Sequence, residues 1–143
     1  MGLRYEDDAF GWAREQAFWL RSGQLSQVDA LNLADKVEDM NSIHEYDLSN
    51  HFACLLAHLA RWQIQEGSRC DLWRRLIDLR RQRIDRMLEN KPGLSGVFSD
   101  NGFMVCAWLD ALFNVIGERG CYDLPSDCPW SIEQALNPDF FPE

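Results

Sequence analysis

Residues 70–89, CDLWRRLIDLRRQRIDRMLE, decide the fold class because their apolar side chains recur with the period of an α-helix. Leu72, Leu76 and Leu79 are spaced by four and three residues, which places them on one face of a helix. Pro92-Gly93 follows and is a strong helix stop. We therefore predict a helix whose leucine side packs into a core. The other apolar residues assigned to this side are Trp73, Ile77, Ile84, Met87 and Leu88.

The same periodicity and stop signals predict the other helices of the chain. They are expected at about 7–22, about 26–65 with a weak interruption at 41–42, about 95–117 with a possible break at 100–102, and 131–138 for a short last helix. No stretch alternates with a period of two, so no strand is predicted. We expect one all-α domain over residues 1–143, an antiparallel helical bundle of about four main helices plus a short C-terminal helix.

Residues 103–116, FMVCAWLDALFNVI, are apolar almost all round. A membrane-spanning helix needs about 20 apolar residues, so this stretch is too short, and it contains Asp110. We expect that carboxylate to pair with an arginine of the helix over 70–89. Two arrangements remain open: a central helix enclosed by the others, or a helix that supplies a dimer face. Of these we expect the homodimer.

Charge and cysteine content limit the classes of function. The 143-residue chain has a net charge of −9, which disfavours nonspecific binding of the whole molecule to nucleic acid or anionic membrane. Residues 69–91 are the exception, with eight basic and four acidic residues. The five cysteines are odd in number and include no C-x-x-C pair, and the N-terminus has no signal-like apolar run. We therefore expect a cytoplasmic protein.

Arginine binds carboxylates and phosphates through two parallel hydrogen bonds, so the arginines of residues 69–91 are the candidate binding groups. Arg74 and Arg81 each have an acidic residue four positions later, and we expect them on a mixed outer face. Three other arginines fall on the apolar side, where a guanidinium needs a partner. The candidate partner-binding residues are Arg69, Arg80, Arg83 and Trp73.

The partner of these arginines has three interpretations. A stripe of acidic residues in the preceding helical region, at spacings of three and seven, is formed by Asp35, Glu38 and Glu45. Packing this stripe on the basic one needs no ligand, and we predict that Glu38 or Asp35 contacts Arg80 or Arg83. The alternatives are an acidic protein partner and nucleic-acid phosphate, with Trp73 stacking on a base.

No catalytic or metal-binding pattern is present. His44, His51 and His58 are seven residues apart, which corresponds to about 10.5 Å along a helix and is too far for neighbours to bind one zinc ion. Phosphate-binding glycine loops and nucleophile elbows are absent from the sequence. We expect the cysteines to be small buried apolar residues. Accordingly we predict no metal, no cofactor and no catalytic residue, and we favour a protein that is not an enzyme.

Several short motifs, in this order and spacing, resemble one known family. They are Tyr5-x-x-Asp8 with Trp12 and Gln16, NLADKVE at 32–38, HLARWQ at 58–63, Trp73, RQRI at 81–84, Pro92-x-Leu94, CPWSIEQAL at 128–136 and Pro138-Asp139-Phe140. Together they resemble the bacterial family called domain of unknown function 29, over nearly the whole chain. The resemblance implies an all-helical fold and no established activity. Residues 103–116 are more apolar than is usual in that family, which favours self-association.

We therefore expect a small helical protein that acts by binding another protein, through the arginine-rich helix and the exposed part of the tail over 130–141. The alternative is a nucleic-acid-associated protein, nuclease-like and Mg²⁺-dependent, using the arginine-rich helix and an acidic site of Asp35, Glu38 and Glu45. Salt distinguishes the two, because nucleic-acid binding weakens steeply as salt rises.

Overall fold

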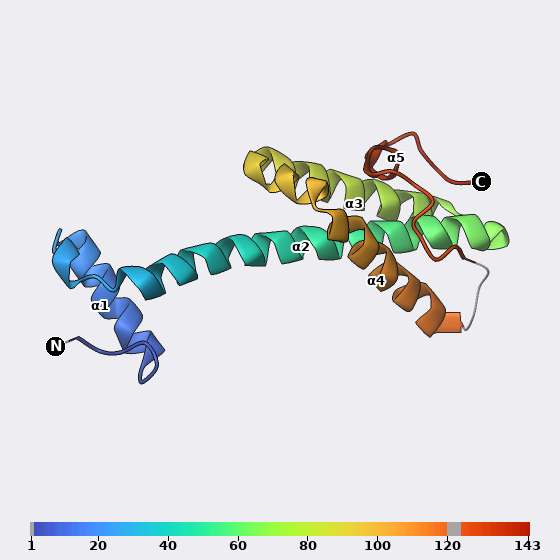
Figure 1. Ribbon diagram of the computed structural model, residues 1–143. Helices are drawn as coiled ribbons and strands as arrows, with labels where there is room; N and C mark the ends of the chain where they lie inside the picture. Colours follow the sequence, from blue (N-terminus) through green and yellow to red (C-terminus); the bar gives the residue numbers. More distant parts are fainter. Residues whose placement is uncertain (1, 120–123) are drawn as a thin grey trace. The chain divides into compact units, whose positions relative to one another are not determined.

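The computed structural model describes residues 2–119 and 124–143, and over these residues it contains helices and no strand (Figure 1). The all-α prediction is thus confirmed. The α-helices are α1 (Ala9–Arg21), α2 (Ala30–Ile64), α3 (Asp71–Asn90), α4 (Asn101–Arg119) and α5 (Ile132–Leu136). Short 3₁₀ helices connect them: η1 (Leu25–Gln27), η2 (Glu66–Ser68) and η3 (Pro92–Ser99).

The helices begin and end near their local sequence signals, but one predicted interruption inside a helix is absent. Asp100 separates η3 from α4, and its side chain accepts a hydrogen bond from the Gly102 amide at 2.9 Å. Ser131 begins α5 with a complete capping box, in which Ser131 and Gln134 bond each other's backbone amides. The predicted interruption at 41–42 is wrong, because α2 continues through it. Asn and Ser destabilise a helix by only about a few tenths of a kcal/mol each. That cost is smaller than the stabilisation of about 1 kcal/mol that one backbone hydrogen bond contributes.

The chain forms two compact units, Met1–Ile43 and His44–Glu143, and α2 begins in the first and ends in the second. The first unit is organised around Asp29, the residue before α2. Its carboxylate accepts a hydrogen bond from the Trp12 indole at 3.0 Å, and its amide donates to the Gln16 side chain at 2.7 Å. The Asn32 side chain also donates to the carboxylate, which keeps the pKa of Asp29 below its ordinary value. Tyr5 packs edge-on against Trp12.

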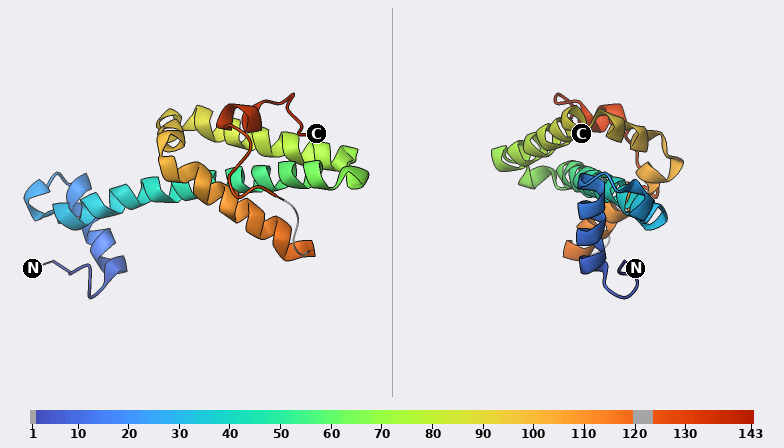
Figure 2. Two further views of the ribbon diagram at one scale, coloured as in Figure 1. Left: turned by 45° about the vertical axis from the view of Figure 1, so that its right-hand side comes forward. Right: turned by 90° about the vertical axis from the view of Figure 1, so that its left-hand side faces the viewer.

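The second unit contains the main core, where α2, α3 and α4 pack together (Figure 2). From α2 the core takes a long apolar stripe that includes Leu48, Phe52 and Leu59, all without exposed surface. Phe52 lies between Phe98 of η3 and Phe103 of α4, with ring centroids 5.8 and 5.3 Å away. The helical connection after α3 is therefore part of the core.

The side of α3 that packs inward is only part of the predicted apolar side. Ile77 and Ile84 are buried, and Trp73, Met87 and Leu88 pack partly buried against the core, as predicted. Leu72, Leu76 and Leu79 are 62%, 38% and 60% exposed. The buried stripe consists of Ile77, Arg81 and Ile84 instead. At about 100° per residue the two stripes lie about 140° apart, and each has helical spacing. The prediction that the three leucines face the core is wrong because Arg81, assigned to the outer face, is the residue that the second unit buries.

Arg81 is buried because the C-terminal tail supplies its partners. Its Nε donates to the Ala135 carbonyl at 2.8 Å, and its Nη2 donates to the Phe140 carbonyl at 2.7 Å. Nη1 donates to the Pro138 carbonyl at 3.4 Å, and Phe141 lies against the guanidinium. Desolvation lowers the pKa of Arg81, but arginine remains protonated at neutral pH. One planar cation thus satisfies three backbone carbonyls of the tail.

Helix α4 is not the central helix, enclosed by the others, that one of the two predicted arrangements required. Phe103, Ala107 and Ala111 face the core, whereas Leu109 is 55% and Phe113 80% exposed. The enclosed alternative is therefore wrong. Asp110 lies on the exposed side and forms no ion pair within the described residues, so its predicted pairing with an arginine of α3 is also wrong.

We predict that Arg81→Met lowers the free energy of unfolding by about 2–4 kcal/mol, because it leaves the tail carbonyls without their donor. Urea unfolding followed by tryptophan fluorescence measures this, since Trp130 at the start of the tail packs against Trp108 of α4. Arg75→Met is the matched control, because Arg75 is an exposed arginine of the same helix. Equal losses in the two variants would show that Arg81 does not hold the tail.

Candidate functional site on helix α3

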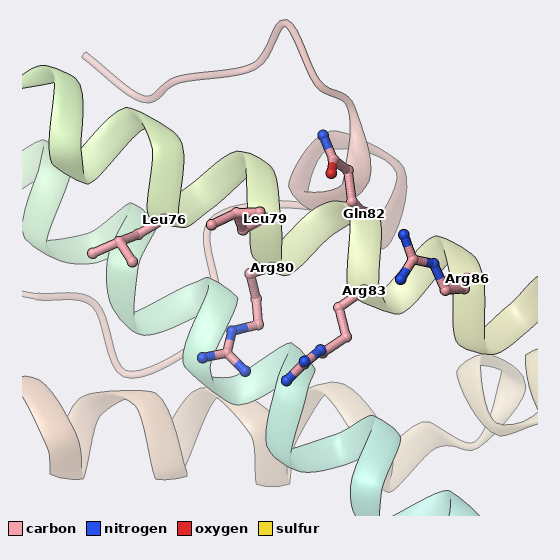
Figure 3. A pocket seen from close by; sticks show the side chains of 6 residues that line it. All are labelled: Leu76, Leu79, Arg80, Gln82, Arg83 and Arg86. Atoms are coloured by element: carbon pink, nitrogen blue, oxygen red, sulfur yellow. The ribbon is translucent and has the colours of Figure 1, made fainter.

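The outward side of α3 combines apolar and basic residues in one stripe. Leu72, Leu76 and Leu79, hereafter the leucine face, are followed at helical spacing by Arg83 and Arg86. A hollow of about 310 Å³ lies where the two parts meet, hereafter the outer hollow (Figure 3). It is lined by Leu76, Leu79, Arg80, Gln82, Arg83 and Arg86.

Arg80 and Arg83 extend from α3 in the same direction, towards α2 (Figure 3). Arg80 is held there by His51 of α2, with 2.6 Å between its Nη1 and the histidine Nδ1. Because arginine stays protonated, Nδ1 of His51 must be the acceptor, which leaves the ring proton on Nε2. Burial, and then the positive charges of Arg80 and Arg83, lower the pKa of His51, while Asp47 acts in the opposite direction.

These arginines are not neutralised by nearby carboxylates. In the described part of the chain, ion pairs within 4.0 Å join Arg4 to Glu6 and Lys36 to Asp39, both outside α3. Neither Arg83 nor Arg86 has a side-chain hydrogen bond or ion pair with the described residues of the second unit. Two guanidinium groups therefore remain available for an external anion.

The predicted acidic stripe does not supply those partners within the second unit. Helices α2 and α3 are neighbours, as expected, but Glu45 makes no ion pair with α3 among the described residues. Asp35 and Glu38 belong to the first unit and are exposed, so their contact with Arg80 or Arg83 stays a prediction.

A second hollow of about 300 Å³, hereafter the basic hollow, lies between α2 and the end of α3. From α2 it is lined by His44, Asp47 and His51, and from α3 and the residue after it by Arg83, Arg86, Met87, Asn90 and Lys91. Arg83 and Arg86 line both hollows. The two hollows are thus adjacent parts of one basic surface.

The other candidate residues lie elsewhere. Arg69 stacks on Trp62 and donates to its carbonyl at 2.7 Å, with a longer contact to Pro142, so it ties the end of α2 to the tail. Trp73 is half-buried and lines a separate hollow of about 190 Å³ with His58. Of the four residues predicted to bind a partner, only Arg80 and Arg83 are therefore brought together.

Sequence reasoning missed Arg86, Lys91, His44 and His51 as members of this surface. The available signal was the helical phase of α3, since Arg83 and Arg86 continue the spacing of the leucine face. His44 and His51 belong to the predicted histidine row and do lie on one side of α2, because both line the basic hollow.

The described residues contain neither a metal-binding cluster nor a membrane-spanning helix. Within residues 2–119 and 124–143, no group of three or more His, Cys, Asp or Glu residues is placed to hold a metal ion. No helix in that part of the chain is long and apolar enough to cross a membrane. Cys70 and Cys106 are exposed, so the expectation of buried cysteines is wrong for these two.

Comparison with known proteins defines the family. The family model described as Domain of unknown function DUF29 matches residues 4–141. The chain belongs to this family. Neither a curated protein nor a solved structure matches it.

The residues that suggested the DUF29 family have mostly structural contacts in this chain. Trp12 and Gln16 bind Asp29, and Arg81 binds the tail that contains Pro138 and Phe140. Among the motif residues, Gln82 lines the outer hollow and Arg83 lines both the outer and the basic hollow. Membership in the DUF29 family therefore agrees with the fold and assigns no activity to the surface.

We predict that His51 makes stability depend on pH. Because its pKa is lowered in the folded state, the unfolded chain binds the proton first as pH falls through the ordinary value of 6.5. The contribution of His51 to stability is therefore complete above that value and decreases below it. The difference in urea midpoint between wild type and His51→Gln should shrink from about pH 8 to pH 5, the range over which histidine titrates. A difference that stays constant over this range would contradict the lowered pKa.

Proposed function

We propose that this protein binds another protein through the outer face of α3, and that the partner is an acidic helix with apolar side chains on one side. The observation that supports this most directly is the leucine face, which continues into arginines without carboxylate partners. A partner with leucine-like residues followed by acidic ones would cover both parts. Helix-in-groove recognition of this kind uses contacts at i, i+3, i+4 and i+7. No catalysis is proposed.

Binding requires both the leucine face and the arginines that follow it. Complete burial of a leucine contributes about 1.5–3 kcal/mol, so covering the exposed portions of the three leucines contributes about 2–5 kcal/mol. Micromolar affinity requires about 8 kcal/mol. The leucine face alone is therefore too small, and charge-assisted hydrogen bonds to Arg83 and Arg86 are needed to orient and retain the partner.

A protein partner agrees with this surface better than nucleic acid does. Nucleic-acid interfaces are strongly basic and polar, whereas this one places three exposed leucines beside the arginines. The acidic site of the nuclease-like alternative would need Asp35, Glu38 and Glu45 to converge. These residues belong to different compact units and form no metal-binding group among the described residues. We also propose that the protein is cytoplasmic, because its cysteines are odd in number and include no C-x-x-C pair.

We predict that Leu76→Ser/Leu79→Ser and Arg83→Glu/Arg86→Glu each weaken partner binding at least about tenfold, which corresponds to the loss of 1.4 kcal/mol. The first step is to identify the proteins that the full chain retains from nuclease-treated lysate. Synthetic peptides with the acidic segments of those proteins are then titrated against each variant. Leu31→Ser is the control, because Leu31 is an exposed leucine of another helix, α2. Loss of all retained material on nuclease treatment would favour the nucleic-acid alternative.

We also propose that the chain forms a homodimer through α4. Val105, Leu109, Phe113 and Ile116, hereafter the α4 stripe, recur at helical spacing and are all exposed. The polar residues Asp110 and Asn114 lie beside this stripe, and the Asn114 amide bonds the Asp110 carbonyl. In a two-fold dimer the same stripe faces itself, so an apolar strip is self-complementary.

We predict a mass of about twice 16.6 kDa by light scattering at tens of micromolar. Leu109→Ser/Phe113→Ser should shift the mass to that of one chain. Phe18→Ser is the control, since Phe18 is exposed on α1. A wild-type mass near 16.6 kDa would contradict the proposed homodimer.

A further inference from the structure

The basic hollow has an excess of positive charge that nothing in the described chain balances. Arg83, Arg86 and Lys91 contribute three cations to its lining, and Asp47 is its single carboxylate. No ion pair among the described residues involves any of these four side chains. The surrounding chain is strongly acidic, so this local excess is not a consequence of overall composition. A concave site lined by one sign of charge concentrates counter-ions.

His51 adds a donor to the hollow without adding charge. His51 accepts from Arg80 at Nδ1, so its Nε2 carries the ring proton and can donate to an anion. This contact also holds Arg80 on the α2 side, while the guanidinium groups of Arg83 and Arg86 have no partner among the described side chains. Donors thus approach the hollow from both helices.

Size and lining select among anions. A volume of about 300 Å³ is at the lower end for small-ligand sites. The lining contains no Phe, Tyr or Trp. Its rings are the small imidazoles of His44 and His51, and His51 is engaged by Arg80, so a nucleotide base would have little surface to stack on. A carboxylate offers two oxygens in one plane, whereas a phosphate offers oxygens in several directions, which suits guanidinium groups that extend in different directions from different turns of a helix.

We infer that the basic hollow binds a compact multivalent phosphate anion, of which diphosphate is the simplest example. The ligand is held by Arg83, Arg86 and Lys91, with His51 as a neutral donor. This site does not require the protein partner proposed above. The two share Arg83 and Arg86, whereas the leucine face belongs only to partner binding and Lys91 only to the anion.

The test is isothermal titration of sodium diphosphate into the full chain, in low-salt buffer without phosphate. We expect saturable binding with a dissociation constant below about 1 mM, and at least tenfold weaker binding of inorganic phosphate, which carries fewer charges. Arg83→Gln/Arg86→Gln should reduce diphosphate affinity at least tenfold. Lys91→Gln, a change after the last turn of α3, should reduce it severalfold. Circular dichroism and melting curves verify that each variant is folded.

Two controls separate this site from general electrostatics and from partner binding. Arg75→Gln removes one arginine charge from the same helix outside the hollow and should leave diphosphate affinity unchanged. Leu76→Ser/Leu79→Ser should also leave it unchanged, even where partner binding is lost. The inference is overturned by an absence of saturable binding, by an Arg75→Gln loss equal to that of the double variant, or by ADP binding more than tenfold tighter than diphosphate, since the last would require a base-binding surface.

Discussion

The hydrogen bonds from Arg81 to three carbonyls of the C-terminal tail determine which way α3 faces. A guanidinium removed from water needs partners for its donors, and the tail supplies them at Ala135, Pro138 and Phe140. With Arg81 turned inward, Ile77 and Ile84 enter the core beside it. The opposite stripe, with its leucines and further arginines, must then face outward.

This division gives the arginines of the second unit two different roles. Arg81 and Arg69 donate to backbone carbonyls and stack on aromatic rings, so their charges are used to fasten the tail. Arg83 and Arg86 have no such contacts among the described residues, and Arg80 binds only a neutral histidine. The charge available to a ligand is therefore concentrated near the end of α3, although the basic residues are spread over the whole segment.

Helix content was predictable because its signals are local. Periodicity, the stop at Pro92-Gly93 and the Ser131 capping box depend on residues within a few positions of one another. The orientation of α3 was not predictable in the same way. Its two apolar stripes are similar in length, and the carbonyls that decide between them are 54 to 59 residues away from Arg81. The basic hollow was missed for the same reason, since its membership follows from that orientation.

A net charge of −9 is compatible with an anion site because electrostatic interactions in salt are short-ranged. At physiological ionic strength the Debye length is about 8 Å, so a small ligand in the basic hollow interacts mainly with the side chains that line it. A long polyanion extends well beyond that distance and meets the acidic remainder of the chain, which repels it. Binding of an acidic helix to the leucine face depends less on charge than binding of a long polyanion does, because its apolar side chains contribute free energy that salt does not screen. The same local charges therefore favour compact anions and acidic amphipathic segments over extended nucleic acid.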